Sequence, residues 1–382
     1  MTDQDVRDFL ERMAVEEPAP FLDPAPLTRR ARRRAARTVV FGALGAAAAI
    51  AALFVGVSEL REASPTVPAI DPTPTPAAVA SGAIAYSLDG DIYVADPEGS
   101  NAVRIADSTT DARCEGISEY SMPSWSPDGT HLAFQRDCPT SDQTDVVITD
   151  PQGNIVTEVP RDGWGFSWSP DSTRIAVWET WPETVDVYGV DGEREESLAL
   201  GPDVKVHNDA SPMWMPDGSA LLMDGVYEIP LDGGSPHEWG VGLLRRLEQV
   251  TYSADGTRVA LIKRNSIDIL DVADGTSVST VAGLTDVDVW SPDGDRFASL
   301  AHGELNVVDV ASGTVTVLTE ARTALNGAKI LGVRGFSPRG DRILYEAGDG
   351  VGGATALWSI GVHGSGARIV VAGTTQGDWR SR

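Results

Sequence analysis

The chain has 382 residues, and its 56 acidic and 30 basic side chains give a formal net charge of −26. So strong a negative charge argues against nucleic acid as a partner, because phosphate groups would be repelled. The length suffices for one large domain with additional segments, and the 39 glycines and 24 prolines are typical of a turn-rich all-β protein.

Residues 1–37 form a polar segment that becomes basic at its end, where six arginines lie between positions 29 and 37. They are followed directly by residues 38–57, which carry no charge. Twenty helical residues span roughly 30 Å, the thickness of the hydrocarbon core of a bilayer. The sequence therefore predicts a single transmembrane helix over 38–57, with residues 1–37 as a cytoplasmic tail held inside by its arginines.

Residues 58–81 are rich in Pro and Thr, which favours an extended, semi-rigid linker. A cleaved secretory signal is the alternative to a retained helix. It is disfavoured because the charged residues 58–62 offer no small-residue cleavage site. We therefore expect a protein of the cell membrane with a single span and with residues 82–382 outside the cytoplasm.

Beyond residue 82, one short motif recurs: an aromatic residue followed by Ser, Pro, Asp and Gly. Its clearest copy occupies residues 125–129, and successive copies start 38 to 46 residues apart. A period of roughly 40 to 45 residues is typical of the four-stranded blades of a propeller. The six copies start at Trp125, Trp168, Trp214, Tyr252, Trp290 and Phe336.

The motif has the chemistry of a tight turn between two strands. Proline presets the first φ angle, aspartate suits the next position, and glycine accepts the positive φ that closes the hairpin. A short apolar strand follows each turn, as at residues 132–134 and 175–177. A second strand–turn–strand pattern follows, as at 92–99 and 305–313, which completes four strands. We interpret the aromatic residue as packing between blades.

The two ends of the repeat region complement each other. The first copy, residues 82–105, lacks an innermost strand, whereas the last residues end in an aromatic position, Trp379, with nothing after it. Trp379 lies 43 residues after Phe336, in register with the repeat. The sequence therefore predicts that the C-terminal strand completes the first blade, which gives seven blades and removes an exposed edge.

This repeat resembles the WD40-like, TolB-type β-propeller repeat, in which an aromatic-Ser-Pro-Asp-Gly turn is followed by an apolar strand and by a strand ending near Asp-x-x-Gly. The resemblance covers residues 82–382. It implies a seven-bladed propeller, but such propellers serve as binding platforms, as partner domains of peptidases and as sensors. It therefore implies a fold more strongly than an activity.

The only two cysteines, Cys114 and Cys138, lie almost symmetrically about the first turn. If the strands on either side of that turn pair as a hairpin, the two thiols face each other near its open end. In an oxidising compartment a disulfide is expected. Two free thiols are the alternative.

We find no sequence pattern for catalysis, a cofactor or a metal. There is no Gly-x-Ser-x-Gly, no His-Glu-x-x-His and no phosphate-binding loop, and the five histidines are isolated. Asp286 and Asp288 are close enough in sequence to share a cation, but a solvated pair is the simpler interpretation. No catalytic, cofactor or metal residues are predicted.

Propellers usually bind ligands at the mouth of the central channel, where loops lead into the innermost strands. Those loops precede each aromatic position here and mix charged with aromatic residues. The candidate binding residues are Asp162, Trp164, His207, Asp209, Arg245, Asp286, Asp288 and Arg334.

Three functions remain open. The first is a membrane-tethered extracytoplasmic binding module for a protein, peptide or envelope ligand. The second is a single-pass sensor with a cytoplasmic partner on residues 1–37. This layout resembles that of membrane-bound anti-sigma-type regulators, although the His and Cys-x-x-Cys motif of the zinc-containing regulators is absent from this sequence. The third is a propeller enzyme of the lyase or lactonase type.

Overall fold

The computed structural model describes residues 81–110, 114, 118–138, 143–161, 165–180, 183–201, 204, 206, 211–238, 247–318, 328–348, 355–374 and 376–380. The predicted cytoplasmic tail, the predicted transmembrane helix and all but the last residue of the predicted linker lie outside these residues. Within the described ranges, no helix has the length and apolar character needed to cross a bilayer.

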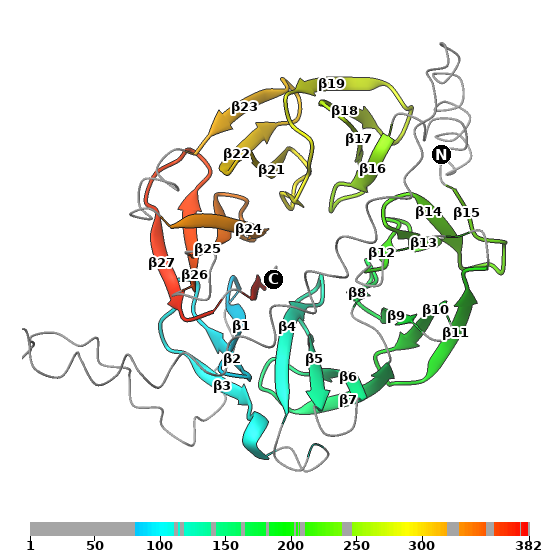
Figure 1. Cartoon of the computed structure of the whole chain (residues 1–382), viewed down its shortest axis with the longest axis vertical. Helices are drawn as coiled ribbons and strands as arrows, with labels where there is room; N and C mark the ends of the chain where they lie inside the picture. Colours follow the sequence, from blue (N-terminus) through cyan, green and yellow to red (C-terminus); the bar gives the residue numbers. More distant parts are fainter. Residues whose placement is uncertain are drawn as a thin grey trace, which may run out of the picture. The chain divides into compact units, whose positions relative to one another are not determined.

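The described residues form seven antiparallel sheets of four strands each, set radially around a centre (Figure 1). The first sheet contains, from the centre outward, β28 (Gly377–Trp379), β1 (Ile84–Leu88), β2 (Asp91–Ala95) and β3 (Val103–Ala106). The second contains β4 (Glu119–Trp125), β5 (Leu132–Cys138), β6 (Gln143–Thr149) and β7 (Ile155–Arg161). The third contains β8 (Phe166–Trp168), β9 (Arg174–Thr180), β10 (Glu183–Gly189) and β11 (Arg194–Ala199).

The remaining four sheets repeat this order. The fourth contains β12 (Met213–Trp214), β13 (Ala220–Met223), β14 (Tyr227–Pro230) and β15 (His237–Glu238). The fifth contains β16 (Leu247–Tyr252), β17 (Arg258–Lys263), β18 (Ser266–Asp271) and β19 (Ser277–Ala282). The sixth contains β20 (Val289–Trp290), β21 (Arg296–Ala301), β22 (Glu304–Asp309) and β23 (Thr314–Val317). The seventh contains β24 (Lys329–Phe336), β25 (Arg342–Gly348), β26 (Thr355–Gly361) and β27 (Arg368–Ala372). One short 3-10 helix, η1 (Ser108–Thr110), follows β3.

The hydrophobic core lies between neighbouring sheets, because the second strands are buried on both faces. Trp125 packs with Ala85 and Ile92 of the first sheet and with Phe134 of its own sheet. The same arrangement recurs round the ring at the aromatic positions. Trp168 even donates a hydrogen bond from Nε1 to the Ser124 carbonyl of the previous sheet (3.1 Å). The prediction that the repeated aromatic residue packs between blades is confirmed.

The repeated turn connects the innermost strand to the second strand in six of the seven sheets, the exception being the first, where β28 is the last strand of the chain. In the first copy, Ser126 donates its hydroxyl hydrogen to Asp128 Oδ1 (2.7 Å) and accepts the His131 N–H at Oγ (3.0 Å). Gly129 has a φ of 70°, a backbone conformation that is unfavourable for residues with a side chain. The buried serine is therefore satisfied by the aspartate, which explains why these residues occur together.

The C-terminal strand closes the ring as predicted. β28 pairs antiparallel with β1, with Trp379 opposite Ile84 and Gly377 opposite Tyr86. The last strand, β28, therefore lies at the centre of the ring beside β1 (Figure 1). The predicted all-β, seven-bladed propeller closed by the C-terminal strand is confirmed.

Candidate binding face

The end of the ring at which the innermost strands begin is called the loop face here. Segments that lead into β4, β8, β12, β16, β20, β24 and β28 meet at this end, and the repeated turns lie at the opposite end because consecutive strands are antiparallel. Five predicted binding residues lie outside the described residues and stay predictions: Asp162, Trp164, His207, Asp209 and Arg245. Asp286, Asp288 and Arg334 are described.

Asp286 and Asp288 lie in the segment that leads into β20, on either side of the buried Val287. Asp288 Oδ2 accepts the Leu300 N–H (2.7 Å), so this carboxylate joins the segment to β21. Burial raises the pKa of Asp288, and the charge of Asp286 adds to the increase. Asp288 thus has a structural contact in addition to any role in binding. Across the described part of the chain, no group of three or more His, Cys, Asp or Glu side chains could hold a metal ion.

Arg334 lies on β24, the innermost strand of the seventh sheet, within an irregular stretch of its pairing with β25. Its guanidinium forms an ion pair with Glu346 of β25, whose side chain is largely buried. The pair neutralises a carboxylate that would be costly to bury alone. The side chain of Arg334 is exposed whereas that of Glu346 is largely buried, so the ion pair contacts solvent on its arginine side.

Two innermost strands expose both charged and apolar side chains. On β24, Lys329, Leu331 and Arg334 are exposed, and Leu331 retains 38% of its free surface. On β4, Glu119 and Met122 are exposed, Met122 also to 38%. The exposed residues of β24 and β4 are called the inner stripe. Interfaces between polypeptides have an apolar centre and a polar rim, and the inner stripe offers side chains of both kinds.

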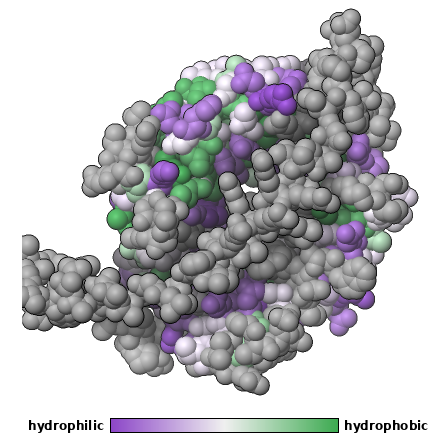
Figure 2. Space-filling view, in the orientation of Figure 1, coloured by the Kyte–Doolittle hydropathy of each residue, from purple (hydrophilic) through white to green (hydrophobic). Residues whose placement is uncertain are grey.

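Further exposed apolar side chains lie on the outermost strands, among them those of the sixth and seventh sheets. Val315 and Val317 are exposed on β23, and Ile369 on β27. On the side of the ring drawn in Figure 2, green apolar residues gather over this sector, whereas purple hydrophilic residues are spread round the ring. Ile155 and Val156 on β7 of the second sheet are exposed as well, to 61% and 46%, so the exposed apolar side chains of the outermost strands do not single out one part of the ring.

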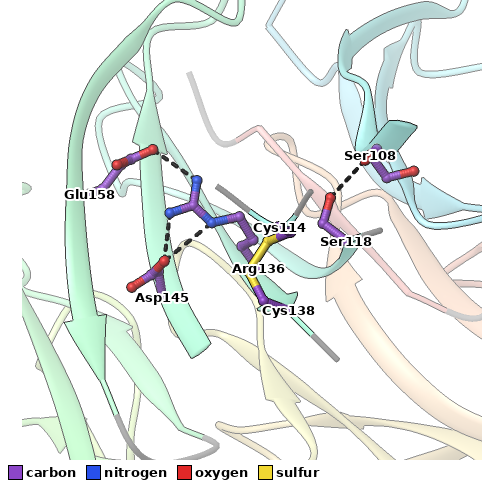
Figure 3. The surroundings of a disulfide bond; sticks show 7 residues. All are labelled: Ser108, Cys114, Ser118, Arg136, Cys138, Asp145 and Glu158. Carbon is purple, nitrogen blue, oxygen red and sulfur yellow. Dashed lines mark hydrogen bonds and ion pairs between the residues drawn. A yellow bond between two sulfur atoms is a disulfide. The ribbon is translucent and has the colours of Figure 1, made fainter. Parts of the chain in front are cut away.

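Cys114 and Cys138 form the predicted disulfide, with their Cα atoms 5.1 Å apart (Figure 3). The geometry differs from the simple hairpin expected from the sequence. Cys138 ends β5, but Cys114 precedes β4 and lies in the segment between β3 and β4. The disulfide therefore ties a loop of the loop face to the second sheet.

The same loop is closed at its base by buried serines. Ser108 donates its N–H and its hydroxyl hydrogen to Asp91 Oδ1 (2.8 and 2.7 Å). Ser118 donates its hydroxyl hydrogen to the Ser108 carbonyl (2.9 Å; Figure 3). Hydrogen bonds at both ends and a disulfide at Cys114 thus give this loop a fixed base beside β4.

An ion-pair network beside the disulfide was not predicted from the sequence. Arg136 on β5 is 2% exposed and contacts Asp145 on β6 (Nε to Oδ2, 3.2 Å) and Glu158 on β7 (Nη1 to Oε1, 2.8 Å; Figure 3). Burial alone would lower the pKa of Arg136, but the hydrogen bonds to both carboxylates raise it above its ordinary value. The arginine stays charged and joins three strands. Its signal in the sequence is an arginine in a strand that begins with three apolar residues, with acidic residues in the two strands that follow.

Comparisons with known proteins identify the fold but not the activity. No family model matches the sequence, and no curated protein does. Among solved structures, a functionally unknown protein from Desulfotomaculum acetoxidans DSM 771 aligns over 78% of this chain and 99% of its own, with 13% identity and a TM-score of 0.52. TolB from Acinetobacter baumannii aligns over 78% of this chain and 66% of its own, just under two thirds, with 15% identity and a TM-score of 0.45. The Myceliophteria thermophila Cps50 (Swd1) β-propeller domain aligns over 70% of this chain and 94% of its own, with 12% identity and a TM-score of 0.47.

At these identities the similarity establishes the architecture alone. The first of these structures, together with the seven four-stranded sheets, supports the WD40-like propeller expected from the repeat.

Proposed function

We propose that this chain is a membrane-tethered, extracytoplasmic propeller that binds a protein or peptide on its loop face. The observation that carries the proposal is the inner stripe, where apolar Leu331 and Met122 are exposed beside charged Lys329 and Glu119. A polypeptide supplies both apolar and charged groups and therefore matches such a surface. A nucleic acid matches it less well, because the net negative charge of the protein would repel the phosphate groups.

Neighbouring residues extend this surface with charges of opposite sign. Asp286 and Asp288 lead into β20, while Lys329 and Arg334 lie on β24, the next innermost strand round the ring. A ligand that carries both signs of charge can be oriented by such an arrangement.

The extracytoplasmic location is proposed from the disulfide and from the N-terminal sequence. Disulfides persist in oxidising compartments and are rare in the cytosol. Arginines before the apolar residues 38–57 favour an orientation in which the part that follows is exported. Protease added to intact cells should digest the propeller while residues 1–37 stay protected. Protection of the propeller in intact cells would contradict this part of the proposal.

The binding surface is tested with Leu331→Ser in the full chain. We expect cross-linking in isolated envelopes to join the wild-type protein to a defined polypeptide, and Leu331→Ser to reduce that product at least about fivefold, because one exposed apolar contact is lost. Ile369→Ser is the matched control, since Ile369 is 51% exposed but lies on the outermost strand β27. Equal loss in both variants, or in neither, would exclude the inner stripe as the binding surface.

A further inference from the structure

The C-terminal strand is bound to two sheets at once. Its backbone pairs with β1, and its side chains reach sideways to β4 of the second sheet. Gln376 Oε1 accepts the Met122 N–H (2.6 Å), and Asp378 Oδ2 accepts the Trp125 N–H (2.8 Å). These contacts, together with those of Arg380, are called the closing seam.

Arg380 completes the closing seam at the turn after β4. Its Nε donates to the Gly129 carbonyl (2.8 Å), and its guanidinium lies over the ring of Trp125, 5.4 Å from the ring centroid. Gln376, Asp378 and Arg380 are alternate residues, so they point to the same face of the strand. That face is directed at the second sheet.

The seam also accounts for an irregularity of β4. The pairing of β4 with β5 shifts between Ser121 and Ser124, and Met122 has a φ of 52°. The register places the Trp125 N–H on the edge of β4 that faces away from β5. The side chains of Gln376 and Asp378 therefore satisfy backbone donors that the β4–β5 ladder leaves open.

Asp378 is an exception within the repeat. It occupies the position immediately before the aromatic residue of the innermost strand, directed at the next sheet. The other six sheets have residues without an ionisable group at this position: Ser124, Ser167, Met213, Thr251, Val289 and Gly335. The one carboxyl group at this position thus occurs where the last strand of the propeller pairs with β1.

The elements beside β28 carry several charged groups, among them the exposed Glu119 on β4 and Asp128 in the turn after β4, which accepts the hydroxyl hydrogen of Ser126. Arg380, two residues along, bonds to the Gly129 carbonyl. Arg334 on the adjacent β24 is paired with Glu346. On β1 the titratable side chain is Tyr86, and burial raises its pKa to about 12, so it stays neutral. The carboxyl group of Asp378, in a partly buried position, is therefore held by backbone N–H groups.

We propose that ring closure is linked to protonation of Asp378: the neutral carboxyl group holds β28 against β4, and its ionisation loosens the closing seam. A neutral carboxyl oxygen accepts the Trp125 N–H without the cost of burying a charge. An ionised one gains solvation when the short strand moves away from β4.

The direction of the pH effect follows from burial. Burial raises the pKa of Asp378 from 3.8 to about 7, against the lowering effect of the N–H groups of Trp125 and Trp379. A group whose pKa is raised in the folded protein contributes stability that is fully present below its ordinary pKa. This stability is lost as the pH rises through the raised pKa. The closing seam should thus be tightest below about pH 4, loosen as the pH rises from there through about 7, and change little at higher pH.

Hydrogen exchange of the full chain tests this proposal. Exchange rates, corrected for the intrinsic effect of pH, are compared at about pH 5.5 and about pH 8.5 for peptides that contain β28 and β4. We expect exchange in both strands of the wild type to be on the order of tenfold faster at the higher pH. Asp378→Asn, which keeps an oxygen acceptor but cannot ionise, should show no such increase.

Two further variants make the result decisive. Asp288→Asn removes another acid whose pKa is raised, on the distant β20, and should leave the response of β28 and β4 as in the wild type. If Asp378→Asn does not fold, Asp378→Ser introduces the residue found before Trp125 and Trp168 and should likewise abolish the response. An unchanged pH response in the Asp378 variants, or its loss in Asp288→Asn, would overturn the proposal, as would a wild type without any response.

Discussion

Asp341 accepts the hydroxyl hydrogen of Ser337 at Oδ1 (2.7 Å), and so replaces the aspartate that the last repeated turn lacks. In four earlier turns the serine bonds to an aspartate two residues later, as Ser291 does to Asp293 (2.6 Å). In the last turn that position is Arg339, and a carboxylate four residues after the serine takes over the same contact. The hydrogen bond is thus retained although the motif is not.

Replacing Asp341 should destabilise the seventh sheet, whereas replacing Arg339 should not. Asp341→Ala leaves the buried hydroxyl of Ser337 without its acceptor, a loss of about 1 kcal/mol in the free energy of unfolding. Arg339→Ala is the matched control in the same turn. Urea denaturation of the two variants checks the difference, and equal stability would show that the hydrogen bond contributes nothing.

Removal of the disulfide should lower global stability. Cys114 and Cys138 are 24 residues apart, and a cross-link that closes a loop of this size contributes about 3 kcal/mol. Replacing both residues by serine should lower the urea midpoint, and a thiol reductant should lower that of the wild type to a similar value. A reductant effect that persists in the double serine variant would contradict this explanation.

Arg136→Met should destabilise the second sheet strongly. It leaves Asp145 and Glu158 without their shared cation in a buried position, which typically costs about 3–5 kcal/mol. Arg368→Met is the control, because the Arg368–Glu98 pair (3.4 Å) is exposed on both sides, and its loss should cost less than about 1 kcal/mol. Chemical denaturation measures both, and similar small losses would show that the buried network adds little.

The repeated turns should make the protein sensitive to acid. The hydrogen bond from Ser169 holds the pKa of Asp171 below its ordinary value, and bonds from Thr173 add to this against the opposing effect of burial. A lowered pKa contributes stability that is present above the ordinary value, 3.8, and is lost as the pH falls through the lowered one.

Asp171→Asn should therefore flatten the fall in thermal stability below about pH 4, and Ser169→Ala, which removes the donor, should do the same. Melting temperatures measured across the acid range check both variants. Acid sensitivity equal to that of the wild type in both would rule out this turn as a source of the effect.

Much of the fold was accessible from the sequence because its determinants are local. The φ preference of proline favours the turn in five of the six copies, and the spacing of the aromatic residues gives the number of sheets. The position of Trp379 in register with the repeat was enough to predict the closing strand, and the two cysteines were enough to predict their disulfide. None of these inferences required knowledge of distant contacts.

The candidate site was less accessible, because its geometry depends on how neighbouring strands are paired. Asp286, Asp288 and Arg334 were found from their positions before or within innermost strands, but the partners of Asp288 and Arg334, Leu300 and Glu346, come from the second strands beside them. The exposure of Leu331 and Met122 could not be predicted, since alternation in these strands is interrupted by irregular pairing.

The sequence by itself determined the repeat, the turns and the closure of the ring, because these follow from conformational preferences that each short segment carries alone. Only the tertiary structure decided where charges are satisfied. Arg136 finds its carboxylates on two other strands, and Asp378 meets Trp125 across 253 residues of chain. Such contacts form only when the sheets are assembled round one centre, and no local pattern specifies which side chains then face each other.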